Sequence, residues 1–450
     1  MNNKFKISLS LLFSVLVMSC HAENKTTDML RTLVSGSFTA GEEYESPDDL
    51  SGINIFIVDR SNEPVDTLYR AVTDEAGNFA SEAVFTRKGE YPILVMKDNR
   101  PLDSFTLVLA EDDPVRIEGT LPELQDSRTI QSNENEALRT YRRLDNQYYR
   151  TVNLINAGAV EEDEIPAMID TWSDLFWSIR QDYPNTLAAE RATNKSLEVL
   201  DGWNDQKTLE RIQSDLADDN LQEAAIYYGT VAMIRLEGLD SSISFLNELD
   251  ERMQNEENKR LVAMNKIEIL YDSLRVDQAR AAFRQYESRF QGTPDSLWAS
   301  KMNYELNNMA PGMALPSFEL QTHQQGTVTN ESLEGSPYII ELVELTSRQY
   351  QGSHSALIQL AGSASDKDIK LITVPLEHST ITINAFYEER TEPWAVATSR
   401  AYEEANLIEL LNINQLPTRI LVDRDGKIVR KTVGNNLQQI ARDIETLINQ

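Results

Sequence analysis

A single cysteine, Cys20, limits the architecture and the chemistry of this 450-residue chain more than any other feature. One thiol excludes an intramolecular disulfide, a CxxC redox pair and a thiolate metal cluster. The fold must therefore be stabilised by hydrophobic cores. At ~100–200 residues per domain, the length predicts two to four domains that are large enough to form such cores.

Cys20 ends an N-terminal targeting segment. Lys4 and Lys6 are followed by an apolar stretch over residues 7–18 that is too short to span a bilayer as a helix. The sequence Val-Met-Ser-Cys at 17–20 resembles a bacterial lipobox, whose cysteine is lipidated. The resemblance implies a signal peptide over 1–19, lipidation of Cys20 and a tether over 20–29. An ordinary secretory signal cleaved after Ala22 is the alternative.

The charge and composition exclude several classes of protein. A net charge of −30 repels phosphate backbones, so nucleic-acid binding is not expected. No stretch after the signal contains 18 consecutive apolar residues, so we expect a membrane anchor made of lipid alone. The four histidines lack metal-ligand spacing, and we expect neither a metal nor another cofactor.

The first folded part, residues 30–124, is predicted to be a β-sandwich. Residues 53–58 and 105–109 have strand length and are rich in branched and aromatic side chains. Residues 73–79 place Asp and Gly for a hairpin turn. We interpret the acidic residues at 111–114 as a turn between strands rather than a cation site.

Residues 125–310 are predicted to form an α-helical domain. Apolar side chains recur with helical period from Leu138 to Ile155 and from Ile165 to Ile179. Near 240–300, an alanine and aromatic pattern resembles one helix of a tetratricopeptide hairpin. The array is either generic helical hairpins or tetratricopeptide-like in this stretch.

Residues 311–450 alternate between strands and helices. The pattern predicts strands at 315–320, 338–343, 368–374 and 419–423, a hairpin through 427–429 and a closing amphipathic helix. A parallel β-α-β unit followed by a hairpin and a helix is a thioredoxin-like order. The predicted fold class is therefore multidomain α+β, with a β-sandwich, a helical array and a C-terminal α/β domain.

Three motifs in this last domain resemble the redoxin and thiol-disulfide oxidoreductase superfamily. They are an entry motif at 313–320, a loop into the central strand at 333–340, and the segment 416–428 with its Leu-Pro-Thr and Asp-Gly turns. The resemblance extends to bacterial envelope lipoproteins in which a small β-sandwich precedes the thioredoxin-like domain. It implies a cis Pro417, and a segment Leu416, Pro417 and Thr418 whose backbone binds an extended substrate.

The sequence departs from this superfamily at its reactive site. The family places Trp-Cys-x-x-Cys where a helix follows the central strand, and our alignment puts Arg348 and Gln351 at the cysteine positions. Neither side chain can form a disulfide, so thiol redox catalysis is excluded. Ser347 and His354 lie in the same stretch, but hydroxyls at a helix start are usually caps, and we assign no catalytic residue.

These observations predict a lipid-anchored cell-envelope protein, on the periplasmic face of the outer membrane by family resemblance. Its redox-inactive thioredoxin-like domain would bind or scaffold an envelope protein or peptide. One alternative is residual or partner-dependent oxidoreductase activity within the thiol-disulfide oxidoreductase and antioxidant family. The other is a helical-repeat interaction protein. We expect no enzymatic activity from the chain by itself.

Overall fold

The computed structural model describes residues 29–44, 49–61, 64–214, 219–293, 295–323, 326–365, 368–388, 394–434 and 436–448. Cys20 and the predicted signal peptide lie outside these residues. The chain divides into two compact units, one ending at Val262 and the other containing Ala263–Gln450. Each unit is described by itself.

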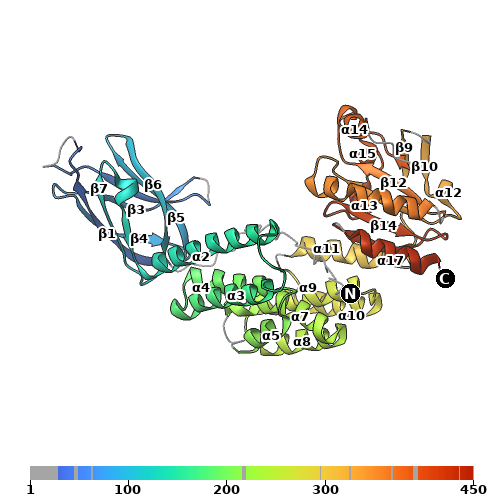
Figure 1. Cartoon of the computed structure of the whole chain (residues 1–450), viewed down its shortest axis with the longest axis horizontal. Helices are drawn as coiled ribbons and strands as arrows, with labels where there is room; N and C mark the ends of the chain where they lie inside the picture. The colour runs from blue at the N-terminus through green and yellow to red at the C-terminus, as the bar shows by residue number, and fades with distance from the viewer. Residues whose placement is uncertain are drawn as a thin grey trace. The chain divides into compact units, whose positions relative to one another are not determined.

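The first unit begins with two four-stranded sheets (Figure 1). The first sheet has the order β4 (Asn78–Phe85), β1 (Leu30–Ala40), β7 (Val115–Leu121) and β8 (Thr129–Gln131), and the second has the order β3 (Asp66–Val72), β2 (Asn54–Asp59), β5 (Gly89–Lys97) and β6 (Arg100–Leu109). Alternate side chains from both sheets form one core, which includes Phe38, Ile55, Phe85 and Ile93. This arrangement agrees with the expected N-terminal β structure.

The turn expected at residues 73–79 forms, but it does not close a hairpin within one sheet. The Gly77 N–H donates to the Asp74 carbonyl at 3.0 Å, and the Asp74 N–H donates to the Asn78 carbonyl at 2.9 Å. The strands that it joins, β3 and β4, belong to different sheets. The turn residues favour a tight reversal, but they do not specify which strand becomes the neighbour of each arm.

Helices make up the rest of the first unit. They are α1 (Leu124–Ser127), α2 (Asn133–Asn156), α3 (Ile165–Asp182), α4 (Leu187–Leu200), α5 (Asp205–Ser214), α6 (Asp219–Ala224), the π-helical turn η1 (Ala225–Gly229), α7 (Thr230–Glu237) and α8 (Leu239–Arg252). A short break after Asp182 separates α3 from α4, and Asn185 there adopts a left-handed φ of 63°. None of the described helices is long and apolar enough to cross a membrane.

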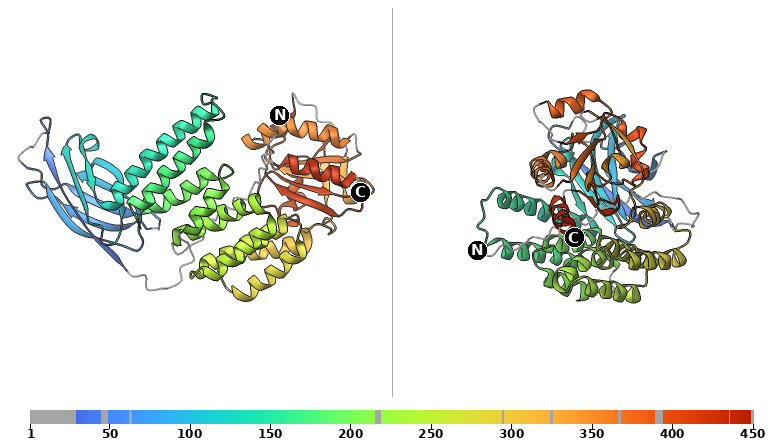
Figure 2. Two further views of the ribbon diagram at one scale, coloured as in Figure 1. Left: turned by 60° about the horizontal axis from the view of Figure 1, so that its bottom comes forward. Right: turned by 90° about the vertical axis from the view of Figure 1, so that its right-hand side faces the viewer.

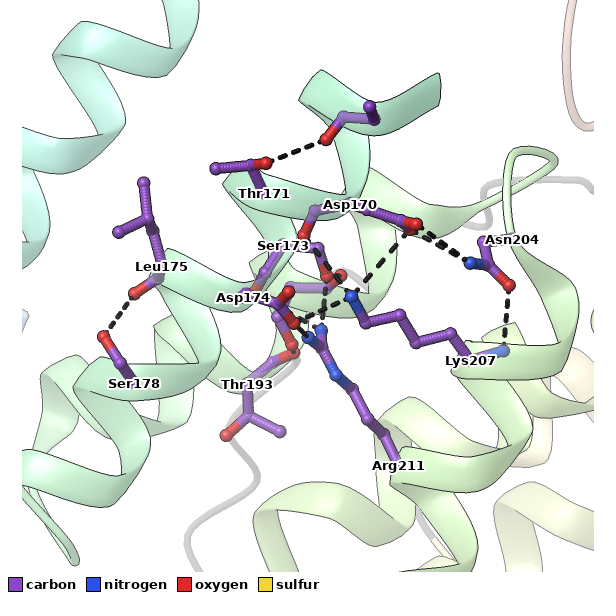
Figure 3. A network of polar contacts seen from close by, with 12 residues as sticks. Asp170, Thr171, Ser173, Asp174, Leu175, Ser178, Thr193, Asn204, Lys207 and Arg211 are labelled. Atoms are coloured by element: carbon purple, nitrogen blue, oxygen red, sulfur yellow. Dashed lines mark hydrogen bonds and ion pairs between the residues drawn. The ribbon is translucent and has the colours of Figure 1, made fainter. Parts of the chain in front are cut away.

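A polar network joins α3 to α5 (Figure 3). The Asp174 carboxylate forms ion pairs with Lys207 at 2.8 Å and with Arg211 at 2.5 Å. Arg211 also bonds to the Ser173 hydroxyl, and Asn204 donates to Asp170 at 3.0 Å. The Asp174 side chain is 60% exposed, so these pairs orient the two helices more than they stabilise them.

The second unit contains the end of the helical region. Helix α9 (Glu256–Asp272) crosses the division between the units, and α10 (Val276–Arg289), α11 (Ser296–Tyr304) and the π-helical turn η2 (Glu305–Met309) follow it. The tetratricopeptide-like pattern falls on α8 and α10. Phe283 and Tyr286 of α10 pack with Trp298 of α11, with ring centroids 6.3 and 5.0 Å apart. The aromatic side chains of this pattern thus pack against the next helix.

A mixed five-stranded sheet forms the centre of the C-terminal domain. Its order is β13 (Ala395–Val396), β12 (Lys370–Pro375), β11 (Tyr338–Val343), β14 (Thr418–Val422) and β15 (Ile428–Val433). Strands β11, β12 and β13 are parallel, and β14 and β15 are antiparallel to their neighbours. All six residues of β11 are buried, which explains why five of them are apolar and only Glu341 is charged.

Helices lie on both faces of this sheet (Figure 2), and each face has its own core. On one face, Ile339, Val343 and Leu421 pack with side chains of α13 (Arg348–Ser365), α14 (Thr380–Tyr387) and α17 (Leu437–Ile448). The other face packs with α15 (Ala401–Glu404), α16 (Leu407–Leu410) and the hairpin β9 (Glu319–Thr322) and β10 (Gly326–Thr329). The strand order and the helices on both faces define a thioredoxin-like fold.

The strand predicted at 315–320 is wrong in its position. The strand β9 starts at Glu319 and pairs with β10, which sequence analysis did not predict. Leu315 and Phe318 are buried outside a regular strand, and the Asn330 side chain accepts from the Phe318 N–H at 2.7 Å. The apolar run therefore reflects packing onto the domain core rather than strand pairing.

Candidate functional site

The residues singled out in the C-terminal domain lie at one end of its sheet. Strand β11 ends at Val343, shortly before α13 begins at Arg348, and Thr418 pairs opposite Leu342. The segment Leu416–Thr418 therefore reaches the sheet beside the start of α13. Gly434 supports this position, because its N–H donates to the Pro417 carbonyl at 2.8 Å, and a Cβ added at Gly434 would lie 3.7 Å from Gln349 Nε2 of α13.

The start of α13 carries no thiol. Arg348 is the first helical residue and is exposed, and Gln351 is exposed one turn later. The Gln351 side-chain amide donates to the Leu345 carbonyl at 3.1 Å, back into the preceding loop. At the positions where our alignment puts the cysteines, the chain thus has a cation and an amide, and neither is a nucleophile that can be oxidised and reduced reversibly.

Two oxygen acceptors fix the loop in front of α13. The Ser347 hydroxyl accepts from the Tyr350 N–H at 3.2 Å, which is the geometry of a helix N-cap. Glu377, which follows β12, accepts from the N–H groups of Leu345 and Thr346 at 2.5 and 3.3 Å. Burial raises the pKa of Glu377 above its ordinary value, and its backbone hydrogen bonds oppose that rise. The loop conformation therefore depends on a carboxylate from the neighbouring strand.

The segment Leu416–Thr418 leaves part of its backbone available. The Leu416–Pro417 peptide bond is cis, as the family resemblance implies. The Thr418 hydroxyl donates to the Gln415 carbonyl at 2.6 Å and closes the turn. Within the part of the chain that the structure describes, no hydrogen bond joins the Leu416 N–H or carbonyl to another residue. Leu416 thus has a donor and an acceptor that an added extended strand can use.

A fully buried ion pair lies between the central strands, close to this end of the sheet. Glu341 of β11 accepts from the Arg419 Nε of β14 at 2.9 Å, and both side chains are 0% exposed. The other Glu341 oxygen accepts from Thr373 at 2.6 Å and from the Tyr350 hydroxyl at 3.1 Å. Burial, and next the charge of Glu341, raise the pKa of Tyr350 far above its usual range, so the phenol is a neutral donor.

Ser347, Ser353 and His354 of this stretch have structural partners. The Ser353 hydroxyl donates to the Tyr350 carbonyl at 3.0 Å. The His354 ring packs edge-on against Phe386, with centroids 5.3 Å apart, and is only 7% exposed. Ser347 is a helix cap, as sequence analysis predicted for hydroxyls at this position. These contacts give no support to nucleophilic catalysis here.

Sequence analysis missed Glu341, Arg419 and Glu377. Glu341 carried a usable signal, because a glutamate interrupts an otherwise apolar strand and a buried charge needs a partner. Arg419 stands at the start of its predicted strand, where a charged residue is not unusual. Glu377 had no such signal. Its carboxylate reaches a loop more than 30 residues away in the chain, and only the parallel pairing of β11 and β12 brings them together.

Comparison with known proteins identifies similar folds and no family. No family model and no curated protein matches the chain. Among solved structures, it resembles a candidate thiol:disulfide interchange protein DsbE from Chlorobium tepidum, with 20% identity over 31% of this chain and 97% of that chain, and a TM-score of 0.28. It also resembles the thioredoxin domain of a thiol-disulfide oxidoreductase from Bacteroides vulgatus, with 18% identity over 29% and 98% of the two chains and a TM-score of 0.27. A third likeness is to StoA from Bacillus subtilis, with 15% identity over 29% and 96% and a TM-score of 0.25.

The class of the domain is defined by its own topology. A thioredoxin-like fold makes up about 30% of the chain, with strand order β13-β12-β11-β14-β15. The sequence contains one cysteine and no CxxC pair.

Proposed function

We propose that the C-terminal domain is a redox-inactive binding module that takes an extended peptide segment of an envelope protein along Leu416–Thr418. The free N–H and carbonyl of Leu416, next to a helix start without a thiol, are the observation that carries this proposal. Backbone pairing of this kind requires no cysteine, because the affinity comes from main-chain hydrogen bonds.

Charge at the same end of the sheet favours an acidic group in the bound peptide. Arg348 is exposed at the first position of α13, an 18-residue helix whose N-terminus adds positive potential. The Glu377 carboxylate faces the loop amides instead and already has hydrogen-bond partners. A peptide with an acidic side chain near its pairing residue would therefore meet Arg348.

Lipid anchoring through Cys20 would place this module at a membrane surface. The support is the Val-Met-Ser-Cys sequence that follows the apolar stretch. The net charge of −30 gives no attraction to anionic headgroups, so the lipid has to supply the attachment. In the cell envelope, partners for an extended-strand site would be exposed or unfolded segments of other envelope proteins.

A disulfide-capture experiment tests peptide binding directly. In mature chain carrying Cys20→Ser, Ser347→Cys places the only thiol at the start of α13, and Ser355→Cys places it on the exposed side of the same helix. Each variant is equilibrated with an acetylated pentapeptide that has a central cysteine in a buffer of reduced and oxidised glutathione, so that thiol-disulfide exchange with oxidised glutathione supplies the mixed disulfides. We expect Ser347→Cys to prefer the peptide over glutathione about tenfold more than Ser355→Cys does, a difference of ~1.4 kcal/mol.

Two further measurements separate strand pairing from non-specific capture. N-methylation of the peptide amide next to the cysteine should remove the preference, because it removes a main-chain donor. Arg348→Ala should weaken capture of a peptide with a flanking aspartate and leave capture of a flanking alanine unchanged. An equal peptide preference at positions 347 and 355 would refute the proposed function.

A further inference from the structure

The end of the helical region is attached to the loop that leads into the proposed binding segment. Helix α11 and the π-helical turn η2 contact residues 410–414, which lie directly before Gln415 and Leu416. The Tyr304 hydroxyl donates to the Leu410 carbonyl at 2.9 Å, and the Asn412 side chain donates to the Lys301 carbonyl at 3.0 Å. Lys301 in turn bonds to the Asn414 side chain.

Glu305, the first residue of η2, is the centre of this attachment. One of its oxygens accepts from Asn412 Nδ2 at 2.7 Å and from Lys431 Nζ at 2.9 Å, and the other accepts from the Tyr271 hydroxyl at 2.9 Å. Lys431 projects from β15 and also donates to the carbonyls of Leu411 and Asn412, both at 2.9 Å. The loop is thus held by a carboxylate from the helices and an ammonium group from the sheet.

The burial of this pair indicates a role in geometry. The side chains of Lys431 and Glu305 are 8% and 10% exposed, so both charges are largely removed from water. A buried ion pair adds little stability compared with apolar side chains of similar size, because desolvation offsets its attraction. It does restrict its partners to one arrangement, and here that arrangement includes two backbone carbonyls of the loop. Asn412 has a left-handed φ of 49°, a conformation that asparagine tolerates.

We propose that Glu305, Lys431 and Asn412 form a positioning device for the peptide-binding segment, so that the α11–η2 end of the helical region controls ligand affinity at Leu416. This inference rests on the proposed function. Only Ile413 to Gln415 separate Asn412 from Leu416, so a shift of the loop moves the free N–H and carbonyl that an added strand must meet. Misplacement of such groups by about 1 Å is sufficient to weaken a directed interaction. The three residues do not touch the ligand in this scheme.

The test replaces the charges without leaving one of them unpaired. The double variant Glu305→Gln, Lys431→Met keeps similar side-chain size, and Lys301→Met removes only the bond to Asn414 at a half-exposed position. Lys427→Met, at an exposed position in the β14–β15 turn, is the matched control. Each change is made in full mature chain carrying Cys20→Ser and Ser347→Cys.

Two readouts are needed. Amide hydrogen exchange over residues 411–416 should accelerate about tenfold in the double variant, with β14 unchanged, because local opening becomes easier. Capture of the pentapeptide relative to glutathione should fall about fivefold in the double variant and less in Lys301→Met, with no change in Lys427→Met.

The two readouts distinguish failure of this inference from failure of the proposed function. Faster exchange with full peptide capture would overturn the coupling, as would exchange and capture both equal to those of the parent. Absence of peptide preference in the parent itself would refute the proposed function. The exchange rates would then still decide whether the buried pair holds the loop.

Discussion

At the scale of single residues, two charged side chains, those of Glu341 and Arg419, are buried in the central sheet. Glu341 and Arg419 are each 0% exposed as side chains, and Thr373 and Tyr350 complete the hydrogen bonds of the carboxylate. A protein that keeps one buried charge without its partner is far less stable than a protein with the intact pair or with apolar side chains in place of both. The pair therefore makes single substitutions costly at both positions.

Glu341→Gln should destabilise the C-terminal domain by about 3–5 kcal/mol, because it leaves the Arg419 guanidinium without a counter-charge. The double variant Glu341→Leu, Arg419→Met should recover most of that loss. Denaturant-dependent hydrogen exchange of the β11 and β14 amides measures both effects in this sheet alone. Glu409→Gln, at an exposed position, is the control and should change stability by less than about 0.5 kcal/mol. A Glu341→Gln protein as stable as the control would show that the pair is not essential.

The raised pKa of Glu377 predicts that the stability of the fold depends on pH. This pKa is raised in the folded state, mainly by burial, so the fold binds the proton more tightly than the unfolded chain does. The stability of the parent relative to Glu377→Gln should therefore rise as the pH falls through the raised pKa, and level off near the ordinary glutamate value of about 4.5. Unfolding midpoints between pH 8 and pH 4 measure this difference. Glu319→Gln, on the exposed side of β9, should show no such trend, and a parallel trend in both would contradict the assignment.

At the scale of elements, side chains complete structures that the backbone leaves open. Strand β6 is the edge of its sheet, and Asn135 of α2 pairs with it as a neighbouring strand would. Asn135 accepts from the Val108 N–H at 2.9 Å and donates to the Val108 carbonyl at 3.0 Å. The helix start thereby covers a strand edge that is otherwise open to another chain.

Asn135→Ala should lower the free energy of unfolding by about 1–3 kcal/mol for each backbone group at Val108 that loses its hydrogen bond. Hydrogen exchange should show lost protection at the Val108 amide, while the β1 amides keep theirs. Asn146→Ala, on the exposed face of the same helix, is the control and should have little effect on either measurement. Retained protection at Val108 would mean that water or a rearranged neighbour replaces the amide.

Sequence patterns predicted the elements better than their partners. The β11 strand was predicted with its bounds, because a mostly apolar run of strand length lies between turn residues. The sequence did not indicate that the two strands joined by the 73–79 turn belong to different sheets, nor that β9 and β10 form a hairpin. Which strands share a sheet depends on contacts between residues distant in sequence. For the candidate site, Arg348 and Gln351 were predicted from a local alignment, and their equivalence to cysteine positions stays a prediction. The roles of Glu341 and Glu377 depend on strand pairing and required the structure.

At the scale of the whole molecule, the proposed membrane attachment would not depend on the folded body. The described helices provide no membrane span, and the proposed anchor rests on one residue near the N-terminus. The body carries excess negative charge, so electrostatic adsorption to an anionic membrane is unfavourable.

Cys20→Ser should therefore release the protein from the membrane fraction of the producing cell. The parent should stay with membranes through a wash with 1 M salt, where the Debye length is ~3 Å, and leave them only in detergent. Fractionation followed by immunoblotting measures both results. Lys25→Ser, a polar change in the expected tether, is the control. Parent protein that salt alone removes would contradict a lipid anchor.

The buried Glu341–Arg419 pair also limits how this domain can be redesigned. Two cysteines introduced at the start of α13 would supply thiols, but the carboxylate that the Tyr350 hydroxyl of this helix contacts would remain paired with a guanidinium. Removing Arg419 would leave an unpaired charge in the core and destabilise the domain. An engineered thiol site that needs a free carboxylate at this position would therefore require several substitutions at once.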